Sequence, residues 1–281
     1  MEQSLTIVVC GAGTMGSGIA QTCIQQGITT ILFDVNEAML GKARNTIEKN
    51  ILSLAEKGRL TIPAATALQS ITYTSSVTNC KADIIIEAIV ENKEAKQLLF
   101  RQLSAQNSSH TIFATNTSSI SVNAIAEGME NASRIAGMHF FNPAPIMKLV
   151  EIVKTEHTSD EVIDTLFNLC RQLNKTPVLC KDAPGFIVNR VARHYYLEAM
   201  KLVELELASI EEADAVMEAA GFKMGPFKLM DLIGMDINYN VSCIVWEAMG
   251  KPGRLQPSII QQQKVEKGEL GRKTGKGFYT Y

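Results

Sequence analysis

The first 35 residues place the strongest constraint on the fold of this chain. Leu5 to Cys10 is a run of mostly β-branched residues, as expected of a parallel strand buried on both faces. It leads into GAGTMG at residues 11–16, which fits the pattern G-x-G-x-x-G, and a helix is predicted from Thr14 to Gln26. A second strand, Thr29 to Phe33, follows. The order strand, glycine loop, helix and strand predicts a βαβ unit and therefore an α/β fold.

The glycine loop and an acidic residue downstream predict a dinucleotide site. Gly11 permits the tight turn, Gly13 lets backbone approach a pyrophosphate, and Gly16 lets the helix pack on the strand. The start of the helix also offers unpaired N–H groups to phosphates. Asp34 ends the second strand, 34 − 16 = 18 residues after Gly16, where a carboxylate can bind both hydroxyls of an adenosine ribose. Because this carboxylate would repel a 2′-phosphate, the predicted cofactor is NAD and not NADP. The alternative interpretation is a structural glycine turn with a surface aspartate.

Strands and helices continue to alternate beyond residue 35. A long helix rich in Lys and Arg is expected from Glu37 to Arg59. The remaining predicted strands are Ala82 to Val90, Thr111 to Ala114, Arg134 to Phe140, Leu149 to Lys154 and Thr176 to Cys180, with helices at Lys93 to Ala105, Val122 to Glu127 and Asp160 to Leu173. This alternation predicts a doubly wound, Rossmann-type sheet.

The pattern changes at the Asp182-Ala183-Pro184-Gly185 break, where we predict the domain boundary. Four helices are expected after it: Ile187 to Leu207, Ile210 to Ala220, Leu229 to Met249 and Gln256 to Lys267. The predicted organisation is a Rossmann-type NAD-binding domain at residues 1–183 and an all-helical C-terminal domain at residues 184–281.

Composition narrows the classes of partner. The 281 residues carry 27 Lys and Arg against 29 Asp and Glu, a net charge of −2, so no global field favours nucleic acid or an anionic membrane. The longest apolar runs fall well short of the ~20 residues of a membrane helix. A small soluble ligand is therefore the expected partner.

Cysteine usage and the N-terminus predict a cytoplasmic protein. The six cysteines are widely spaced and form neither a CxxC pair nor a metal-ligand pattern, so no metal site is expected. Reduced core cysteines are typical of cytosolic proteins. Met1 to Ser4 lacks the positive region of a signal peptide.

One of the four histidines has a distinctive setting. His110, His157 and His194 fall in predicted loops or on a helix surface, whereas His139 ends a predicted sheet strand, at the edge where doubly wound folds bind ligands. If the chain reverses about Pro145, His139 and Glu151 are equidistant from the turn and face each other. An ionised Glu inside an apolar strand needs a partner.

A His–Glu pair suits an alcohol dehydrogenase, because imidazole can take the hydroxyl proton as hydride leaves carbon. The alternative is a buried structural His139 with a coincidental Glu151. Asn116 to Ser119 places hydroxyl groups, among them that of Ser118, at the same sheet edge, although such a run is also an ordinary helix cap.

Taken together, the sequence resembles the short-chain L-3-hydroxyacyl-CoA dehydrogenases, in particular the bacterial 3-hydroxybutyryl-CoA dehydrogenases. The resemblance spans nearly the whole chain. It rests on GAGTMGSGIA at Gly11, EAIVEN at Glu87, NTSSIS at Asn116, GMHFFNPAPIMKLVEIV at Gly137, DAPGFIVNR at Asp182, GPFKLMDLIGMD at Gly225 and KTGKGFY at Lys273. The implied reaction is reversible oxidation of an L-3-hydroxyacyl-CoA by NAD.

The resemblance also implies roles for single residues. It makes His139 the general base and Glu151 its electrostatic partner, with Ser118 and Asn189 holding the oxygen and thioester end of the substrate. The implied NAD contacts are Gly11, Gly13, Thr14, Met15, Gly16, Asp34, Glu91, Lys96, Asn142 and Lys273. It further implies a homodimer, which the apolar spacing along Ile187 to Leu207 favours.

The coenzyme A contacts are less well marked in the sequence. Lys57 matches the lysine of the family that meets the CoA phosphate, whereas Asn50 stands where a serine is common. The cluster Lys49, Lys57 and Arg59 is equally consistent with an exposed helix face. The length of the acyl chain is therefore left open.

Two other functions remain open from sequence alone. A related dehydrogenase acting on a free hydroxy acid or sugar acid would share the fold. A non-catalytic NAD-binding or structural protein would also share it, because fold alone does not fix function. The joint presence of Ser118, His139, Glu151 and Asn189 favours the enzyme.

Overall fold

The structure is a computed structural model that describes residues 5–281, so the prediction made for Met1 to Ser4 lies outside the described residues. The chain divides into two units, the first ending at Asp182 and the second beginning at Ala183. None of the helices in the described part of the chain is long and apolar enough to cross a membrane.

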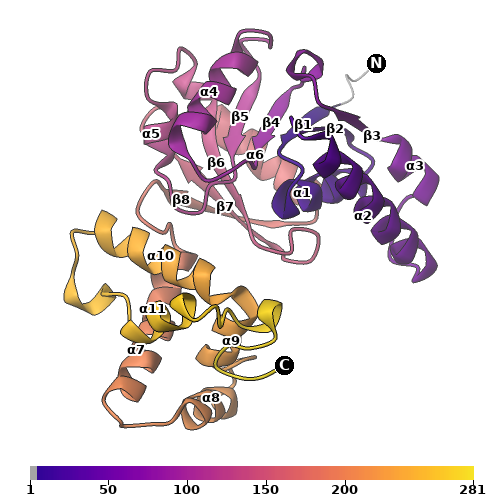
Figure 1. The fold of residues 1–281 in the computed structure, drawn as a ribbon. Coiled ribbons are helices and arrows are strands. Elements are labelled where there is room, and N and C mark those ends of the chain that lie inside the picture. The colour runs from indigo at the N-terminus through magenta and orange to yellow at the C-terminus, as the bar shows by residue number, and fades with distance from the viewer. Residues whose placement is uncertain (1–4) are drawn as a thin grey trace. The chain divides into compact units, whose positions relative to one another are not determined.

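The first unit is built on one eight-stranded sheet with the order β3-β2-β1-β4-β5-β6-β7-β8 (Figure 1). Neighbouring strands are parallel except β6 and β7, which are antiparallel. The strands are β1 (Thr6–Cys10), β2 (Thr29–Phe33), β3 (Ile71–Thr74), β4 (Ile84–Glu87), β5 (Ile112–Thr115), β6 (Ile135–Phe140), β7 (Leu149–Lys154) and β8 (Thr176–Lys181). The predicted Rossmann-type sheet is confirmed.

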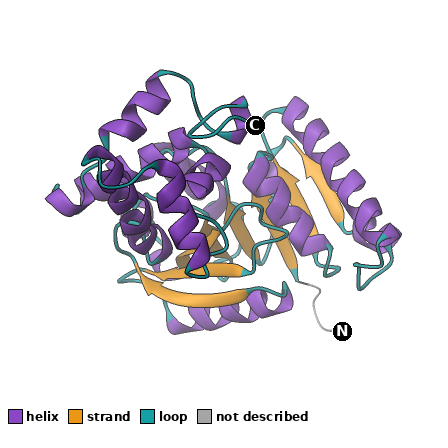
Figure 2. Ribbon diagram, turned by 90° about the horizontal axis from the view of Figure 1, so that it is seen from below, coloured by secondary structure: helices purple, strands orange, loops and turns teal. Residues whose placement is uncertain are grey.

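Helices cover both faces of this sheet (Figure 2). They are α1 (Thr14–Ile24), α2 (Glu37–Glu56), α3 (Ala64–Gln69), α4 (Lys93–Ser104), α5 (Val122–Ala126) and α6 (Asp160–Gln172), with short 3₁₀ turns η1 (Val77–Asn79) and η2 (Ala132–Arg134). The central strands are apolar and buried on both sides, as in β1, where Ile7 to Cys10 are fully buried. Direct burial of this kind explains why the central strands were predictable from sequence.

The winding of the sheet reverses beside β1. The chain passes from β1 outward to β2 and β3, then returns to β4 on the other side of β1. The carboxyl ends of β1 and β4 therefore form a topological switch point, the usual ligand-binding position in such sheets. The residues that follow these strands are Gly11 and Ala88, so the glycine loop lies at this position.

Two elements of the first unit were missed in sequence. Helix α3 and strand β3 had no prediction, because α3 has six residues and β3 is a four-residue, half-buried edge strand. Helix α2 ends at Glu56 and not at Arg59, since Gly58 adopts a positive φ of 63° that ends the helix. The strand predicted from Ala82 to Val90 is also shorter, with β4 ending at Glu87.

The second unit is helical. It contains α7 (Val188–Glu204), α8 (Ile210–Ala219), α9 (Pro226–Ile233), α10 (Met235–Ala248) and α11 (Ile259–Glu266), with 3₁₀ turns η3 (Gly253–Leu255) and η4 (Arg272–Thr274). The described residues of this unit form five α-helices, whereas four were predicted. The difference arises because the helix predicted from Leu229 to Met249 is divided into α9 and α10. Gly234 separates α9 from α10 with a φ of 102°, a conformation that favours glycine.

Two buried carboxylates fix the C-terminal segment to this unit. Asp231 accepts hydrogen bonds from the backbone N–H groups of Phe278 and Tyr279, each at 2.9 Å. Asp214 accepts from the hydroxyl of Tyr279 at 2.8 Å and from the N–H of Phe227 at the start of α9. The chain after α11 is therefore part of the folded unit.

Candidate active site

His139 and Glu151 form a buried cross-strand pair. They lie directly opposite each other in the antiparallel register of β6 and β7, and His139 Nδ1 is 2.8 Å from Glu151 Oε2. His139 is 5% exposed and Glu151 1%, whereas the other three histidines are exposed. The predicted reversal of the chain, which brings these two residues face to face, is confirmed. Phe141 packs on the imidazole with ring centroids 4.6 Å apart.

The turn after β5 is tied to the end of the histidine strand. Asn116 Oδ1 accepts a hydrogen bond from the N–H of Phe140 at 2.8 Å. The cap of α5 is Ser121, whose side chain accepts from Ala124 N–H, so the interpretation of residues 116–119 as that helix's cap is wrong. The turn that carries Ser118 is thus anchored one residue from His139.

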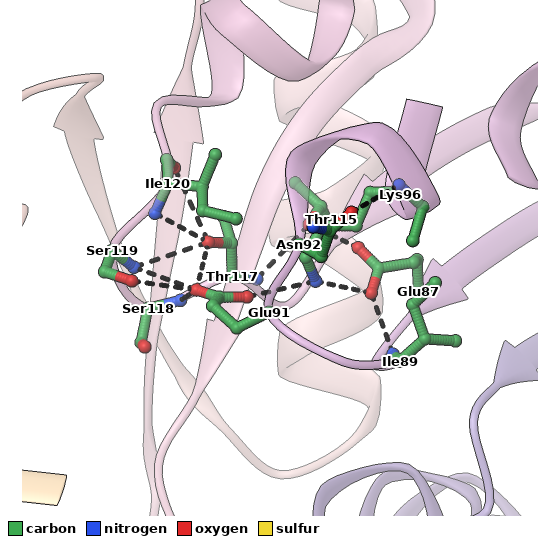
Figure 3. Close-up of polar contacts among 11 residues, drawn as sticks. Glu87, Ile89, Glu91, Asn92, Lys96, Thr115, Thr117, Ser118, Ser119 and Ile120 are labelled. Atoms are coloured by element: carbon green, nitrogen blue, oxygen red, sulfur yellow. Dashed lines mark hydrogen bonds and ion pairs between the residues drawn. The ribbon is translucent and has the colours of Figure 1, made fainter. Parts of the chain in front are cut away.

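The same turn wraps around the carboxylate of Glu91 (Figure 3). Glu91 Oε1 accepts hydrogen bonds from Thr117 Oγ1 at 2.6 Å, Ser118 N–H at 3.0 Å and Ser119 N–H at 3.2 Å. Burial acts to raise the pKa of Glu91, but the Lys96 ammonium and these hydrogen bonds outweigh it and hold the pKa below its ordinary value. Glu91 is therefore ionised at neutral pH and fixes the backbone of Ser118.

Lys96 joins this network to the core of the sheet. Its Nζ lies 2.6 Å from Glu87 Oε1 and 3.1 Å from Glu91 Oε2. Glu87 also accepts from Ile89 N–H at 2.8 Å and from Thr115 Oγ1 at 2.7 Å. Lys96 is 1% exposed and Glu87 0%. The structure therefore places the Lys96 ammonium between two carboxylates, and a direct contact with NAD stays a prediction.

The glycine loop has the geometry that a dinucleotide requires. Gly11 has a φ of 103°, and a Cβ there would lie 2.5 Å from Ala88 O. A Cβ at Gly16 would lie 1.7 Å from Gly11 O, whereas Gly13 has open space beside it. The loop thus packs tightly where helix meets strand and stays open where a pyrophosphate approaches, so these residues fit NAD.

Asp34 supports the loop and keeps acceptor capacity for a ribose. Its Oδ2 accepts from Ala12 N–H at 2.7 Å and its Oδ1 accepts from Asn36 N–H at 2.8 Å. A carboxylate has about four lone-pair sites, so further acceptor capacity remains beyond these two hydrogen bonds. The position of Asp34 at the end of β2 is the one expected for the acidic residue of the motif.

A groove of about 560 Å³ in the first unit brings several predicted residues together. Its walls are the glycine loop with α1, the body of α2, and the segment 142–146. Asn142, Asn50 and Lys57 all line it, as do Gly13 and Thr14. Asn50 Nδ2 donates to Gln21 Oε1 at 2.9 Å, which joins α2 to α1. Three of the predicted dinucleotide contacts, Gly13, Thr14 and Asn142, and both predicted CoA contacts thus line the same groove.

The second unit holds the remaining predicted residues. Asn189 is the second residue of α7, and its carbonyl accepts a hydrogen bond from Arg193 Nε at 3.1 Å. Lys273 Nζ lies 2.5 and 2.7 Å from the two carboxylate oxygens of Asp236. Asp236 is held ionised, because the Lys273 hydrogen bonds outweigh the effect of burial and lower its pKa.

Comparison with known proteins decides the family. The model of the NAD-binding domain of 3-hydroxyacyl-CoA dehydrogenase matches residues 6–183, and the model of the C-terminal domain of the same enzyme matches residues 185–281. The chain belongs to the 3-hydroxyacyl-CoA dehydrogenase family. The resemblance drawn from the motifs and the expectation of NAD are both confirmed.

Relatives and solved structures agree with this family. The dehydrogenase is 43% identical over 279 residues to the 3-hydroxyadipyl-CoA dehydrogenase of Escherichia coli, covering 98% of this chain and 59% of that protein. It is 41% identical to the mitochondrial hydroxyacyl-coenzyme A dehydrogenase of Rattus norvegicus, covering 98% and 90%. The crystal structure of (S)-3-hydroxybutyryl-CoA dehydrogenase PaaH1 from Ralstonia eutropha has a TM-score of 0.94 at 36% identity, covering 99% of each chain.

Sequence reasoning missed Glu87 and Thr115 as parts of the site region. The signal was present, because Glu87 is a carboxylate inside the apolar run ADIIIEAIV and such a group needs a partner. Its partner was not visible in sequence, since Lys96 lies in the next helix and pairs only when α4 packs on the sheet.

Proposed function

We propose that this dehydrogenase catalyses the reversible oxidation of a short-chain L-3-hydroxyacyl-CoA, such as 3-hydroxybutyryl-CoA, to the 3-oxoacyl-CoA with NAD. The observation that carries this proposal is the buried pair of His139 and Glu151, 2.8 Å apart at the end of β6. The relatives named for 3-hydroxybutyryl-CoA support the substrate class. We assign NAD binding to residues 1–183, and substrate binding and dimerisation to residues 184–281.

His139 acts as the general base of this reaction. Donation from Nδ1 to the Glu151 carboxylate fixes the tautomer in which Nε2 carries the lone pair that takes the hydroxyl proton. The carboxylate then stabilises the imidazolium that forms. In the reductive direction the same imidazolium returns the proton to the oxygen at C3.

The other proposed catalytic groups orient the substrate. Ser118 and Asn189 hold its oxygen and thioester end, and the Glu91 hydrogen bonds fix the turn from which Ser118 acts. NAD, when bound, supplies the acceptor for the hydride that leaves C3. Residues proposed to hold it are Gly11, Gly13, Thr14, Met15, Gly16, Asp34, Glu91, Lys96, Asn142 and Lys273.

The groove between α1 and α2 gives the CoA part of the substrate a place to bind. Lys57 and Asn50 line it, so a cation and an amide are available to a phosphate or an adenosine. We therefore propose Lys57 and Asn50 as substrate-binding residues. Replacing Lys57 by Met should raise the KM for acyl-CoA and leave the KM for NADH unchanged.

The first experiment follows NADH absorbance while the purified chain meets acetoacetyl-CoA, with free acetoacetate and NADPH as controls. Rapid oxidation of NADH with the thioester alone is the expected result. The His139→Gln variant should bind NADH normally, and its turnover rate should be about one hundredth of the wild-type rate or lower. Turnover of free acetoacetate would favour a hydroxy-acid dehydrogenase, and NADH binding with no turnover of any substrate would favour a non-catalytic protein.

The assembly and the location are also proposals. A homodimer through the C-terminal helices is supported by the apolar spacing along α7, which leaves Val191 exposed on that helix. A cytoplasmic location and a role in fatty-acid metabolism are supported by the widely spaced cysteines and by the proposed substrate. Sedimentation of the purified chain tests the dimer.

A further inference from the structure

A buried lysine that the proposed mechanism does not use contacts one wall of the groove in the first unit. Lys175 stands in the turn between α6 and β8, and it is 8% exposed. Its backbone N–H donates to Cys170 O at 2.8 Å, which fixes the turn to the end of α6. Lysines are rarely buried unless the ammonium has partners. The contacts of this ammonium therefore indicate what the buried side chain does.

The ammonium of Lys175 binds two carbonyls of the segment between β6 and β7, residues 141–148. Lys175 Nζ donates to Ala144 O at 2.5 Å and to Met147 O at 2.9 Å. Burial disfavours the charged form and lowers the pKa of Lys175, whereas hydrogen bonds to carbonyls favour the charged form. Because a charged donor makes stronger hydrogen bonds than a neutral one, these two contacts hold the segment firmly.

The same segment is also in close contact with helix α1. A Cβ at Gly18 of α1 would lie 3.1 Å from Pro145 Cδ and 3.2 Å from Ala144 Cβ. Within the segment, the N–H groups of Ile146 and Met147 both donate to Pro143 O at 3.0 Å and form a turn. The turn is thus held by packing on α1 and by the hydrogen bonds from Lys175.

This turn forms one wall of the groove of about 560 Å³. Residues 142–146 all line the groove, and Ile146 is 73% exposed. The residues that α2 contributes to the groove include Asn50 and Lys57, and the hydrogen bond from Asn50 to Gln21 joins that helix to α1. The width of the groove therefore depends on where the turn at residues 143–147 is held.

We propose that Lys175 is a positioning residue for the CoA part of the substrate. By holding the carbonyls of Ala144 and Met147, it fixes the groove wall that carries Ile146. Lys175 itself is not among the described residues that line the groove, so it acts through this wall and not by touching the substrate. This inference rests on the proposed function and deepens it, because it adds a residue that sets the affinity for CoA.

The catalytic end of the segment is held by other contacts. Phe140 N–H donates to Asn116 Oδ1 at 2.8 Å, and Phe141 packs on the ring of His139 with centroids 4.6 Å apart. These contacts do not involve Lys175. Removing its ammonium should therefore loosen residues 144–147 and leave the imidazole in place, which predicts an effect on KM and not on kcat.

Steady-state kinetics with two substrates test this prediction. Lys175→Met should raise the KM for acetoacetyl-CoA about tenfold and leave kcat within about threefold of wild type. Acetoacetyl-pantetheine lacks the nucleotide part of CoA, so its KM should change by less than about threefold. A fall in kcat with an unchanged KM for acetoacetyl-CoA, or an equal rise in both KM values, would overturn the proposal.

Calorimetry with free CoA tests the same wall without turnover. Lys175→Met should raise the Kd of CoA about tenfold, and the Kd of NADH should stay within about threefold because Gly13, Thr14 and Asp34 are unchanged. An equal loss of affinity for CoA and NADH would mean that the variant loosens the whole unit. Lys175 would then have a structural role only.

Two further variants show whether the donors of Lys175 cause the effect. Lys175→Arg keeps a charged donor and should bind CoA more tightly than Lys175→Met. The reverse order would contradict donation to the two carbonyls as the cause. Arg171→Met is the matched control, because it removes an exposed cation from α6 four residues earlier in the chain. No change in the Kd of CoA is expected for it, and a rise equal to that of Lys175→Met would refute the specific role of Lys175.

A variant of α1 keeps the proposal testable if Lys175→Met does not fold. Gly18→Ala adds a methyl group against Ala144 and Pro145, so it should displace the same turn and raise the Kd of CoA. An unchanged Kd of CoA in this variant would count against the wall as a determinant of affinity. If the wild-type protein does not reduce acetoacetyl-CoA, the proposed function itself fails. If it does, and Lys175→Met binds CoA as tightly as wild type, only the role of Lys175 is refuted.

Discussion

Each unit contains a buried cation, and the two cations differ in whether carboxylates lie beside them. In the sheet unit, Lys96 Nζ lies 2.6 Å from Glu87 and 3.1 Å from Glu91, so two carboxylates surround one ammonium. In the helical unit, Arg193 is buried to a similar degree among carbonyls, a hydroxyl and an aromatic ring. One cation is neutralised by its own unit, whereas the other is not.

This difference teaches how burial relates to function. A paired cation holds fixed geometry: Lys96 pairs with Glu91, and Glu91 fixes the turn that carries Ser118. A buried cation that its unit leaves unpaired is costly to stability, and such a cost is commonly retained at binding sites. Substitutions at Lys96, Arg193 and Glu91 test whether the two clusters differ in this way, and a substitution at Glu151 tests the catalytic pair beside them.

The largest effect on stability is expected for Lys96→Met. Removing this ammonium leaves the fully buried carboxylate of Glu87 with only neutral donors, and breaking a buried pair in this way costs about 3–5 kcal/mol. Denaturant unfolding followed by circular dichroism measures the loss. A free energy of unfolding within about 1 kcal/mol of wild type would show that the buried pair of Lys96 and Glu87 contributes little to stability.

Glu151→Gln is expected to act mainly on activity. The amide can still accept from His139 Nδ1 but no longer stabilises the imidazolium, so turnover of acetoacetyl-CoA should fall by about 10–10². NADH affinity, measured by calorimetry, should stay unchanged. A variant with wild-type turnover would remove Glu151 from the mechanism and leave it a structural partner.

Arg193→Met is expected to cost less stability than Lys96→Met. The methionine strands no carboxylate, and Ser242 Oγ keeps its hydrogen bond from Gln261, so a loss of about 1–2 kcal/mol is expected. The same unfolding experiment compares the two variants directly. A loss as large as that of Lys96→Met would mean that Arg193 has a strong partner in the folded protein. This result would contradict the difference between the two buried cations.

The smallest effect is a pH dependence at Glu91. Its lowered pKa means that Glu91 adds stability above the pKa of the unfolded chain, near 4.3, which is lost as pH falls through the lower folded value. Glu91→Gln should lower Tm by about 1–3 °C at pH 7, and this difference should shrink as pH falls below the unfolded pKa and through the lowered folded one. A Tm difference independent of pH would assign the effect to packing.

Much of the fold and of the catalytic pair could be predicted from sequence. The strand, glycine loop and helix at residues 5–26 signal their structure locally, because the apolar β-branched run and the G-x-G-x-x-G pattern that follows it are formed by neighbouring residues in the chain. The facing of His139 and Glu151 could be counted from Pro145, since an antiparallel pair joined by a turn has a register set by sequence distance.

The tertiary structure alone decided which distant side chains meet. Nothing in the sequence says that Lys96 pairs with Glu87, that Asn50 joins Gln21, or that Arg193 lies among neutral groups of α10 and α11. The α9 and α10 boundary at Gly234 was equally hidden, because an apolar period of helical spacing runs across it. Such contacts depend on how helix faces pack in three dimensions, whereas the sequence by itself determined the motifs, the alternation of elements and the family.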